Sequence, residues 1–300
     1  MVVSSAVLDW LLDSDASVRF QAIRDLTDAP ADDLRRQRER IAVEGWGARL
    51  LDAQTPDGWW GGDGPGDRWR YALYTLHLLQ QLGVDPAHPR VRAAVEKTRD
   101  AVTWGAEFGD SPFFDGEEEP CINGRALLIG AYFGVASESL YRRLLDEQLD
   151  DGGWNCDAPQ SARGSFHTTI CVLEGLREFE RGREASDARR EGEEYLLRRG
   201  LLRSLSTGGL IDRRFTTFSF PDGSDFDVLR GLDYLRAAGR RPDGRVREAV
   251  EVVRSRRQAD GRWPFVDPGL SHQHVVTETS ADDGSRWNTL RALRVLEWAG

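Results

Sequence analysis

The stretch Gln148-Leu-Asp-Asp-Gly-Gly-Trp154 has two counterparts in the chain, and the three together decide the fold class. The counterparts are Gln54-Thr-Pro-Asp-Gly-Trp-Trp60 and Gln258-Ala-Asp-Gly-Arg-Trp263. Each segment follows an amphipathic helical stretch and precedes a loop that leads to another helical stretch. Recurrence of one segment between helices indicates a helical repeat architecture.

A second pattern, a leucine followed seven residues later by glycine, sets the register of the repeat. Glycine just past a helix end takes the left-handed conformation without a Cβ clash. The pattern occurs at Leu76, Leu127, Leu232 and Leu293, and Leu26 and Leu173 are added by similarity. These leucines predict six matching helices that begin near Val18, Trp69, Cys121, Phe166, Asp225 and Arg286. More charged helical runs lie between them, at residues 2–12, 31–51, 90–104, 137–147, 187–202 and 245–258.

These runs predict an all-α protein with one domain over residues 1–300. The arrangement we expect is an (α/α)6 toroid, in which six inner and six outer helices close around a central cavity. An open solenoid of stacked hairpins is the competing arrangement. No stretch alternates apolar and polar residues in the way that a half-buried strand does.

Composition limits the partners of the chain. Its 300 residues include 40 Lys or Arg and 50 Asp or Glu, which gives a net charge of −10 at pH 7. A negative chain is a poor general binder of nucleic acid and of anionic membranes. No apolar run approaches the roughly 20 residues that span a bilayer, so we expect no integral membrane association. Three cysteines do not make a disulfide framework, and we expect a soluble, cytoplasmic protein.

The register also assigns the faces of the predicted inner helices, at about 100° per residue. The side opposite the leucines faces the cavity of a closed ring, near the N-terminal ends of the inner helices, and carries arginine in four of six helices. Its arginines are expected to bind an anionic ligand such as a diphosphate, and internal salt bridges are the alternative. The residues predicted to bind substrate are Arg70, Tyr71, Arg125, Arg230, Trp287, Asn288 and Arg291.

The Gln…Gly-x-Trp segments resemble the repeat of squalene and oxidosqualene cyclases and of protein prenyltransferase β subunits. The resemblance covers three of the six predicted hairpins. It implies the α/α toroid of that superfamily, which agrees with the ring predicted from the repeat. It also implies two kinds of chemistry, a zinc site and an acid.

The implied zinc site involves the stretch Phe166-His-Thr-Thr-Ile-Cys-Val-Leu-Glu-Gly-Leu176, which is similar to the family helix that carries a zinc-binding His. His167 is then the expected ligand, with Cys121 at the equivalent place on the preceding inner helix and Cys156 in the loop before His167. Two thiolates and an imidazole leave a fourth position for water or substrate, as in catalytic zinc sites. The family's Asp-x-Cys order is not reproduced, and Cys171 is an alternative thiolate. The competing interpretation is that these cysteines are ordinary core residues.

The implied acid is the Asp-x-Asp-Asp run of class II cyclases, which Asp225-Phe-Asp227-Val228 matches except at its last position. If the family's acid role applies here, Asp227 is the proton donor beside Asp225, and it needs burial to hold its proton. Nearby arginines act against this by favouring the ionised carboxylate. The competing interpretation is helix capping, for which Ser224 and Asp225 suit the N-cap position.

Taken together, these residues predict a prenyltransferase- or terpenoid-cyclase-like enzyme with zinc-assisted chemistry on an isoprenoid diphosphate or another anionic small molecule. Three alternatives stay open. They are proton-initiated cyclisation by Asp227, an (α/α) barrel enzyme that processes glycans, and a binding scaffold without catalysis.

Overall fold

In the computed structural model, every regular element among the described residues is helical, which confirms the predicted all-α class. The structure describes residues 3–61, 68–223, 225–269, 275–279 and 283–300. The α-helices are α1 (Ser5–Leu12), α2 (Ala16–Leu26), α3 (Ala31–Arg40), α4 (Gly45–Asp52), α5 (Arg68–Leu82), α6 (Pro89–Ala101), α7 (Pro120–Phe133), α8 (Glu138–Asp146), α9 (Phe166–Phe179), α10 (Asp187–Arg198), α11 (Val228–Ala237), α12 (Arg247–Ser255) and α13 (Arg286–Ala299). Short 3-10 helices are η1 (Ala106–Phe108), η2 (Phe113–Asp115), η3 (Arg213–Thr216) and η4 (Gly244–Val246).

The six helices predicted from the leucine register are α2, α5, α7, α9, α11 and α13, and each begins within three residues of its predicted start. Helix α11 begins later than predicted because Asp227 is its N-cap, with a carboxylate oxygen that accepts a hydrogen bond from the Arg230 N–H at 2.8 Å. The predicted run 31–51 is two helices, α3 and α4. It breaks because Gly45 has a φ of 66°, a left-handed conformation that no continuous α-helix contains.

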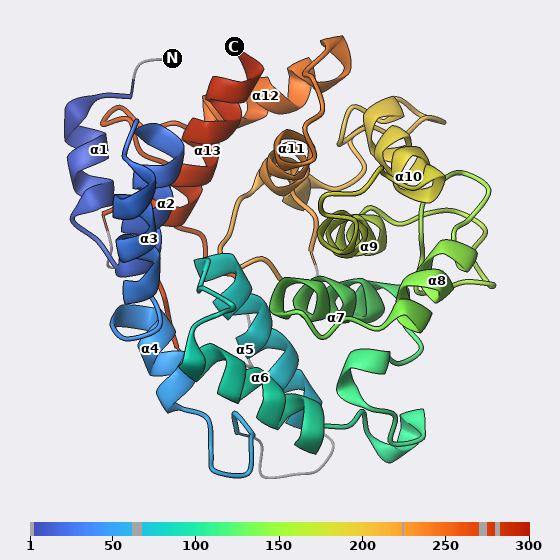
Figure 1. The fold of residues 1–300 in the computed structure, drawn as a ribbon. Helices are drawn as coiled ribbons and strands as arrows, with labels where there is room; N and C mark the ends of the chain where they lie inside the picture. Colours follow the sequence, from blue (N-terminus) through green and yellow to red (C-terminus); the bar gives the residue numbers. More distant parts are fainter. Residues whose placement is uncertain (1–2, 62–67, 224, 270–274, 280–282) are drawn as a thin grey trace.

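Figure 1 shows these six helices succeeding one another around the middle of the molecule, with the other α-helices mostly farther out. Helix α5 packs on α7, α7 on α9, α11 on α13, and α13 on α2. Polar contacts join the two remaining pairs of neighbours. The Gln21 side chain of α2 donates to the Gln81 carbonyl of α5 at 2.8 Å, and Arg230 of α11 pairs with Glu174 of α9 at 2.6 Å. Each of the six helices therefore contacts the next, and the last contacts the first.

The Gln…Gly-x-Trp segments link successive outer helices. Each tryptophan is fully buried, and its indole Nε1 donates to a carbonyl ten residues earlier, at 2.7 to 2.8 Å. The pairs are Trp60 with Leu50, Trp154 with Leu144, and Trp263 with Val253. The amides of Gln54 and Gln148 also donate to carbonyls of the next outer helix, those of Ala94 and Ala188. The first two repeat segments thus form hydrogen-bonded joints between consecutive hairpins.

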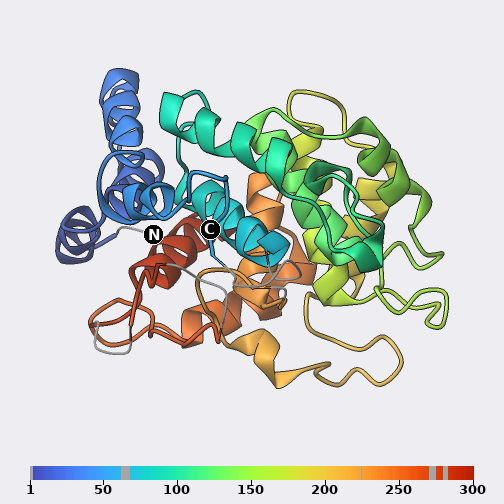
Figure 2. The same ribbon diagram turned by 90° about the horizontal axis from the view of Figure 1, so that it is seen from below.

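The connection from α10 to α11 carries η3 on the lower side of the molecule in Figure 2 and then enters the ring. Inside, the backbone carbonyls of its residues 218–223 accept hydrogen bonds from inner-helix side chains. The donors are Arg125 of α7, Arg230 of α11, and Asn288 and Arg291 of α13. These donors lie in the N-terminal halves of their helices, so the segment occupies that side of the ring interior. In the described part of the chain, no helix has the length and apolarity required to cross a membrane.

Candidate metal centre

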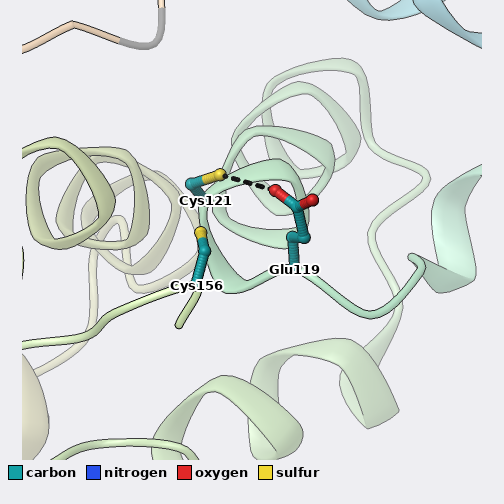
Figure 3. Close-up of side chains that lie close together, drawn as sticks. All are labelled: Glu119, Cys121 and Cys156. Atoms are coloured by element: carbon teal, nitrogen blue, oxygen red, sulfur yellow. Dashed lines mark hydrogen bonds between the residues drawn. The ribbon is translucent and has the colours of Figure 1, made fainter. Parts of the chain in front are cut away.

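Two sulfur atoms and a carboxylate converge where α7 begins. Glu119 precedes the helix, Cys121 is its second residue, and Cys156 approaches from the loop before α9. One ligand atom from each lies within 4.8 Å of the others, and the Cys121 Sγ is 3.6 Å from Oε2 of Glu119. Figure 3 shows the two sulfurs and the carboxylate directed toward one another. Glu119 is exposed and both cysteines are half-buried, so the group is accessible from solvent.

The local sequence explains why the Glu119 carboxylate is available. Pro120 is the first residue of α7, a position where the missing N–H of proline costs nothing. The side chain of Glu117 accepts hydrogen bonds from the backbone N–H groups of Glu118 and Glu119, the latter at 2.9 Å. Glu117 therefore caps the turn that leads into the helix, and Glu119 is free to face Cys121.

Close packing of α7 against α9 brings the two cysteines together. A Cβ at Gly175 would lie 2.3 Å from the Gly124 carbonyl oxygen, which only the absence of a side chain permits. The two backbones are therefore in direct contact. Cys156 is held beside the start of α9, with its Sγ 3.4 Å from the hydroxyl of Thr168.

The two thiols differ in acidity because they share one hydrogen bond. The hydrogen bond from Cys121, aided by one from Thr168, lowers the pKa of Cys156 to about 7, although burial acts in the opposite direction. The same hydrogen bond raises the pKa of Cys121, and burial and the neighbouring thiol groups add to this effect. Cys156 is therefore the first thiolate of the pair near neutral pH, and thiolate is the form that binds metals.

His167, which we predicted as the third ligand, lies outside this group, and Glu119 takes its place. His167 is the second residue of α9 and turns toward the start of α11. Its Nδ1 accepts a hydrogen bond from the Phe226 N–H at 2.8 Å and lies 3.4 Å from a carboxylate oxygen of Asp225. Burial lowers the pKa of His167, so its imidazole is neutral at pH 7. Cys171, the alternative thiolate, is buried between Arg125 and Arg230.

The two predicted catalytic aspartates occupy different environments. Asp227 is 6% exposed and is the N-cap of α11, a role that the capping interpretation gave to Ser224 and Asp225. Ser224 lies outside the described residues. Burial raises the pKa of Asp227 to about 6, against the opposing effect of Arg291. Asp225 is exposed and lies near His167 and Arg214. The structure thus brings neither carboxylate to the metal group.

Of the residues predicted to bind an anion, Arg125, Arg230 and Arg291 do point into the ring, but protein groups already surround them. Arg125 and Arg230 donate to the Gly223 carbonyl at 2.7 and 3.0 Å. Arg230 also pairs with Glu174, and Arg291 pairs with Asp222 at 3.0 Å. The internal network that we kept as the alternative is therefore the one observed for Arg230 and Arg291.

The remaining predicted binding residues lie in the first turns of α5 and α13. Arg70 is exposed and lies over the Trp69 ring at 5.0 Å, and Tyr71 is half-buried. Trp287 is buried and stacks on Phe220 at 4.2 Å, while Asn288 donates to the Phe218 carbonyl at 2.8 Å. Trp287 and Asn288 therefore hold the inserted segment instead of lining an open mouth.

Sequence reasoning missed Glu119 and the inserted segment 218–223. The signal for Glu119 was present, because a carboxylate two residues before Cys121 reproduces the spacing, though not the residue type, of Asp-x-Cys.

Comparison with known proteins assigns no family to the chain. No protein-family model matches it, and no curated protein sequence does. The resemblance to terpenoid cyclases and prenyltransferases consequently rests on the residues quoted from the chain itself.

Proposed function

We propose that this chain is a zinc enzyme resembling the prenyltransferases and terpenoid cyclases, with the metal bound by Glu119, Cys121 and Cys156. The observation that carries the proposal is the convergence of two sulfurs and one carboxylate within 4.8 Å. This donor set suits Zn²⁺, which binds thiolate and carboxylate in sites that leave one position open. When bound, zinc would lower the pKa of a thiol or water in the open position or polarise a carbonyl.

The residues around the group favour its charged state. Cys156 is the thiolate favoured near neutral pH, and a bound zinc would replace the proton of Cys121, whose pKa the shared hydrogen bond and burial raise. The Thr168 hydroxyl is placed to donate to a Cys156 thiolate, and Glu117 supports the turn that presents Glu119. Solvent reaches the exposed Glu119 side, so a substrate thiol or water has access to the same point.

The reaction class comes from the resemblance, which favours transfer or cyclisation of an isoprenoid diphosphate. Among the alternatives, proton-initiated cyclisation has the weaker support, because the Asp227 carboxylate is already engaged as the N-cap of α11. We assign no substrate-binding role to Arg230 and Arg291, because carboxylates of the protein already neutralise them.

Zinc content of the purified protein tests the metal assignment. We expect about one zinc per chain in the wild type, and a large loss in Cys121→Ser, Cys156→Ser and Glu119→Gln. His167→Ala is the matched control and should retain its zinc. Absence of zinc from the wild type, or equal zinc in the wild type and Cys156→Ser, would refute the assignment.

Pyrophosphate release from an isoprenoid diphosphate, with and without an added thiol, tests the reaction class. We expect release by the zinc-loaded wild type and a loss of release in Cys156→Ser. Zinc binding without any release would instead support the non-catalytic scaffold. Activity that survives in Cys156→Ser but is lost in Asp227→Asn would support proton-initiated cyclisation.

A further inference from the structure

A cavity of about 480 Å³ opens at the end of the ring opposite the metal centre. Its walls come mostly from the C-terminal halves of the six inner helices, through residues such as His77, Tyr132 and Arg177. Phe220 and Asp222 of the inserted segment also line it. The segment therefore separates this cavity from the N-terminal side of the ring, where the metal centre lies.

The cavity wall is positively charged although the protein is negatively charged. Seven arginines line it, against five carboxylates, in a chain of net charge −10. One of those carboxylates, Glu174, is paired with Arg230, which is not a lining residue. An excess of positive charge in a concave site attracts anions and concentrates them there.

Arg38 is the lining arginine with the least internal compensation. Its guanidinium donates to the carbonyls of Gly83 and Val84 at 3.1 and 3.2 Å and to the Tyr132 hydroxyl at 2.9 Å. Its partners within the described residues include no carboxylate. A half-buried guanidinium paired only with neutral groups keeps its charge available for an oxyanion.

Several polar groups of the cavity wall also lack hydrogen-bond partners among the described residues. Nε1 of the buried Trp287, Oε1 of Gln81 and Nε of Arg177 are unpaired. His77, which is 3% exposed, lines the same cavity. A buried polar group without a partner is costly, so three such groups around one cavity point to a polar ligand that completes them.

The protonation state of His77 adds to the chemistry of the site. Burial, together with the positive charges of Arg125 and Arg230, holds the pKa of His77 well below its usual value. The neutral imidazole offers one donor and one acceptor. It therefore suits a hydroxyl group, which can donate and accept, better than it suits a second anion.

We propose that this cavity binds a small hydroxylated organic anion, with its phosphate or carboxylate near Arg38 and its hydroxyl groups toward His77 and Gln81. The cavity volume falls in the range of small-molecule sites, roughly 300–1,000 Å³, and fits a ligand of the size of a sugar phosphate or a tricarboxylic acid. The polar wall does not suit an isoprenoid chain. The site is independent of the proposed zinc centre.

Calorimetric titration tests the proposal with four probes: glucose 6-phosphate, citrate, pyrophosphate and uncharged glucose. We expect the two organic anions to bind more tightly than pyrophosphate, and glucose to show no binding at millimolar concentration. Arg38→Gln should weaken the organic anions about tenfold or more, the loss expected for one charge-assisted hydrogen bond. The matched control is Arg35→Gln on the same helix, whose exposed side chain pairs with Asp32 and does not line the cavity.

A second variant tests the same site in case Arg38→Gln does not fold. His77→Leu removes the hydroxyl contact and should weaken glucose 6-phosphate while leaving pyrophosphate unchanged. The preference between glucose 6-phosphate and citrate distinguishes a phosphate ligand from a carboxylate ligand. Binding of none of the anions, or equal weakening by Arg35→Gln and Arg38→Gln, would overturn the proposal.

Discussion

Replacing Asp227 by Asn should stabilise the protein at neutral pH. The carboxyl is buried, and its pKa is raised from 3.8 to about 6. A difference of roughly two units corresponds to about 3 kcal/mol between the two protonation states. Asn is as good an N-cap as Asp, so Asp227→Asn should keep the hydrogen bond to the Arg230 N–H and lose the cost of burying a charge.

The pH dependence gives the sign of the effect. A carboxyl with a raised pKa in the folded state binds its proton more tightly there than in the unfolded chain. Its contribution to stability is therefore greatest below 3.8 and is lost as the pH rises to about 6. We expect Asp227→Asn to be more stable than the wild type by about 3 kcal/mol at pH 7, and by less than about 1 kcal/mol at pH 4.

Urea unfolding of both proteins at the two pH values measures this difference. Other carboxylates titrate in the same range, but they do so in both proteins, so the difference between variant and wild type isolates Asp227. A difference that does not change with pH would refute the reasoning. Destabilisation by Asp227→Asn at pH 7 would show that the charged carboxylate stabilises α11 beside Arg291.

Two further predictions concern the packing and the acidity of the metal centre. Gly175→Ala places a Cβ 2.3 Å from the Gly124 carbonyl oxygen, so it should lower the free energy of unfolding by about 1–3 kcal/mol or more. Gly244→Ala is the control, because the nearest atom to its Cβ is 3.8 Å away, and it should lower that free energy far less. Equal losses of stability in chemical unfolding would argue against close packing of α7 on α9. Cys121→Ala removes the hydrogen bond that lowers the pKa of Cys156. In metal-free protein, the midpoint of the pH dependence of Cys156 alkylation should therefore rise above about 7. An unchanged midpoint would contradict the assigned hydrogen bond.

The fold class could be predicted because its signals are local and repeated. The leucine register located all six inner helices, since amphipathic periodicity depends on neighbours in sequence. The break between α3 and α4 escaped prediction because it depends on Gly45, whose left-handed conformation places a would-be Cβ 2.0 Å from the Asp15 carboxylate. That contact joins distant parts of the chain, and a pattern in sequence does not contain it.

The candidate metal centre could be predicted in part for the same reason. The family resemblance implied a zinc site, helix register placed Cys121 at the start of its helix, and Cys156 was chosen for its place in the loop before His167. Choosing between Glu119 and His167 required the rotation of α9 against α7 and the cap formed by Glu117.

The inserted segment 218–223 illustrates a different limit. The register correctly directed Arg125, Arg230 and Arg291 into the ring, but three of their partners there are the carbonyls of Ser219, Gly223 and Asp225. Every residue has a backbone carbonyl group, so residue types in the sequence do not identify these partners. An inward arginine therefore predicts an acceptor, and does not distinguish a ligand from a loop.

The same segment makes the two proposed sites separable by experiment. It lies between the metal centre at the N-terminal side of the ring and the arginine-lined cavity at the C-terminal side. Because Cys156 and Arg38 share no contact, Cys156→Ser should lose zinc and keep anion binding, while Arg38→Gln should do the reverse. Loss of both properties in each variant would mean that the ring interior responds as one unit, and that the segment couples the two ends instead of separating them.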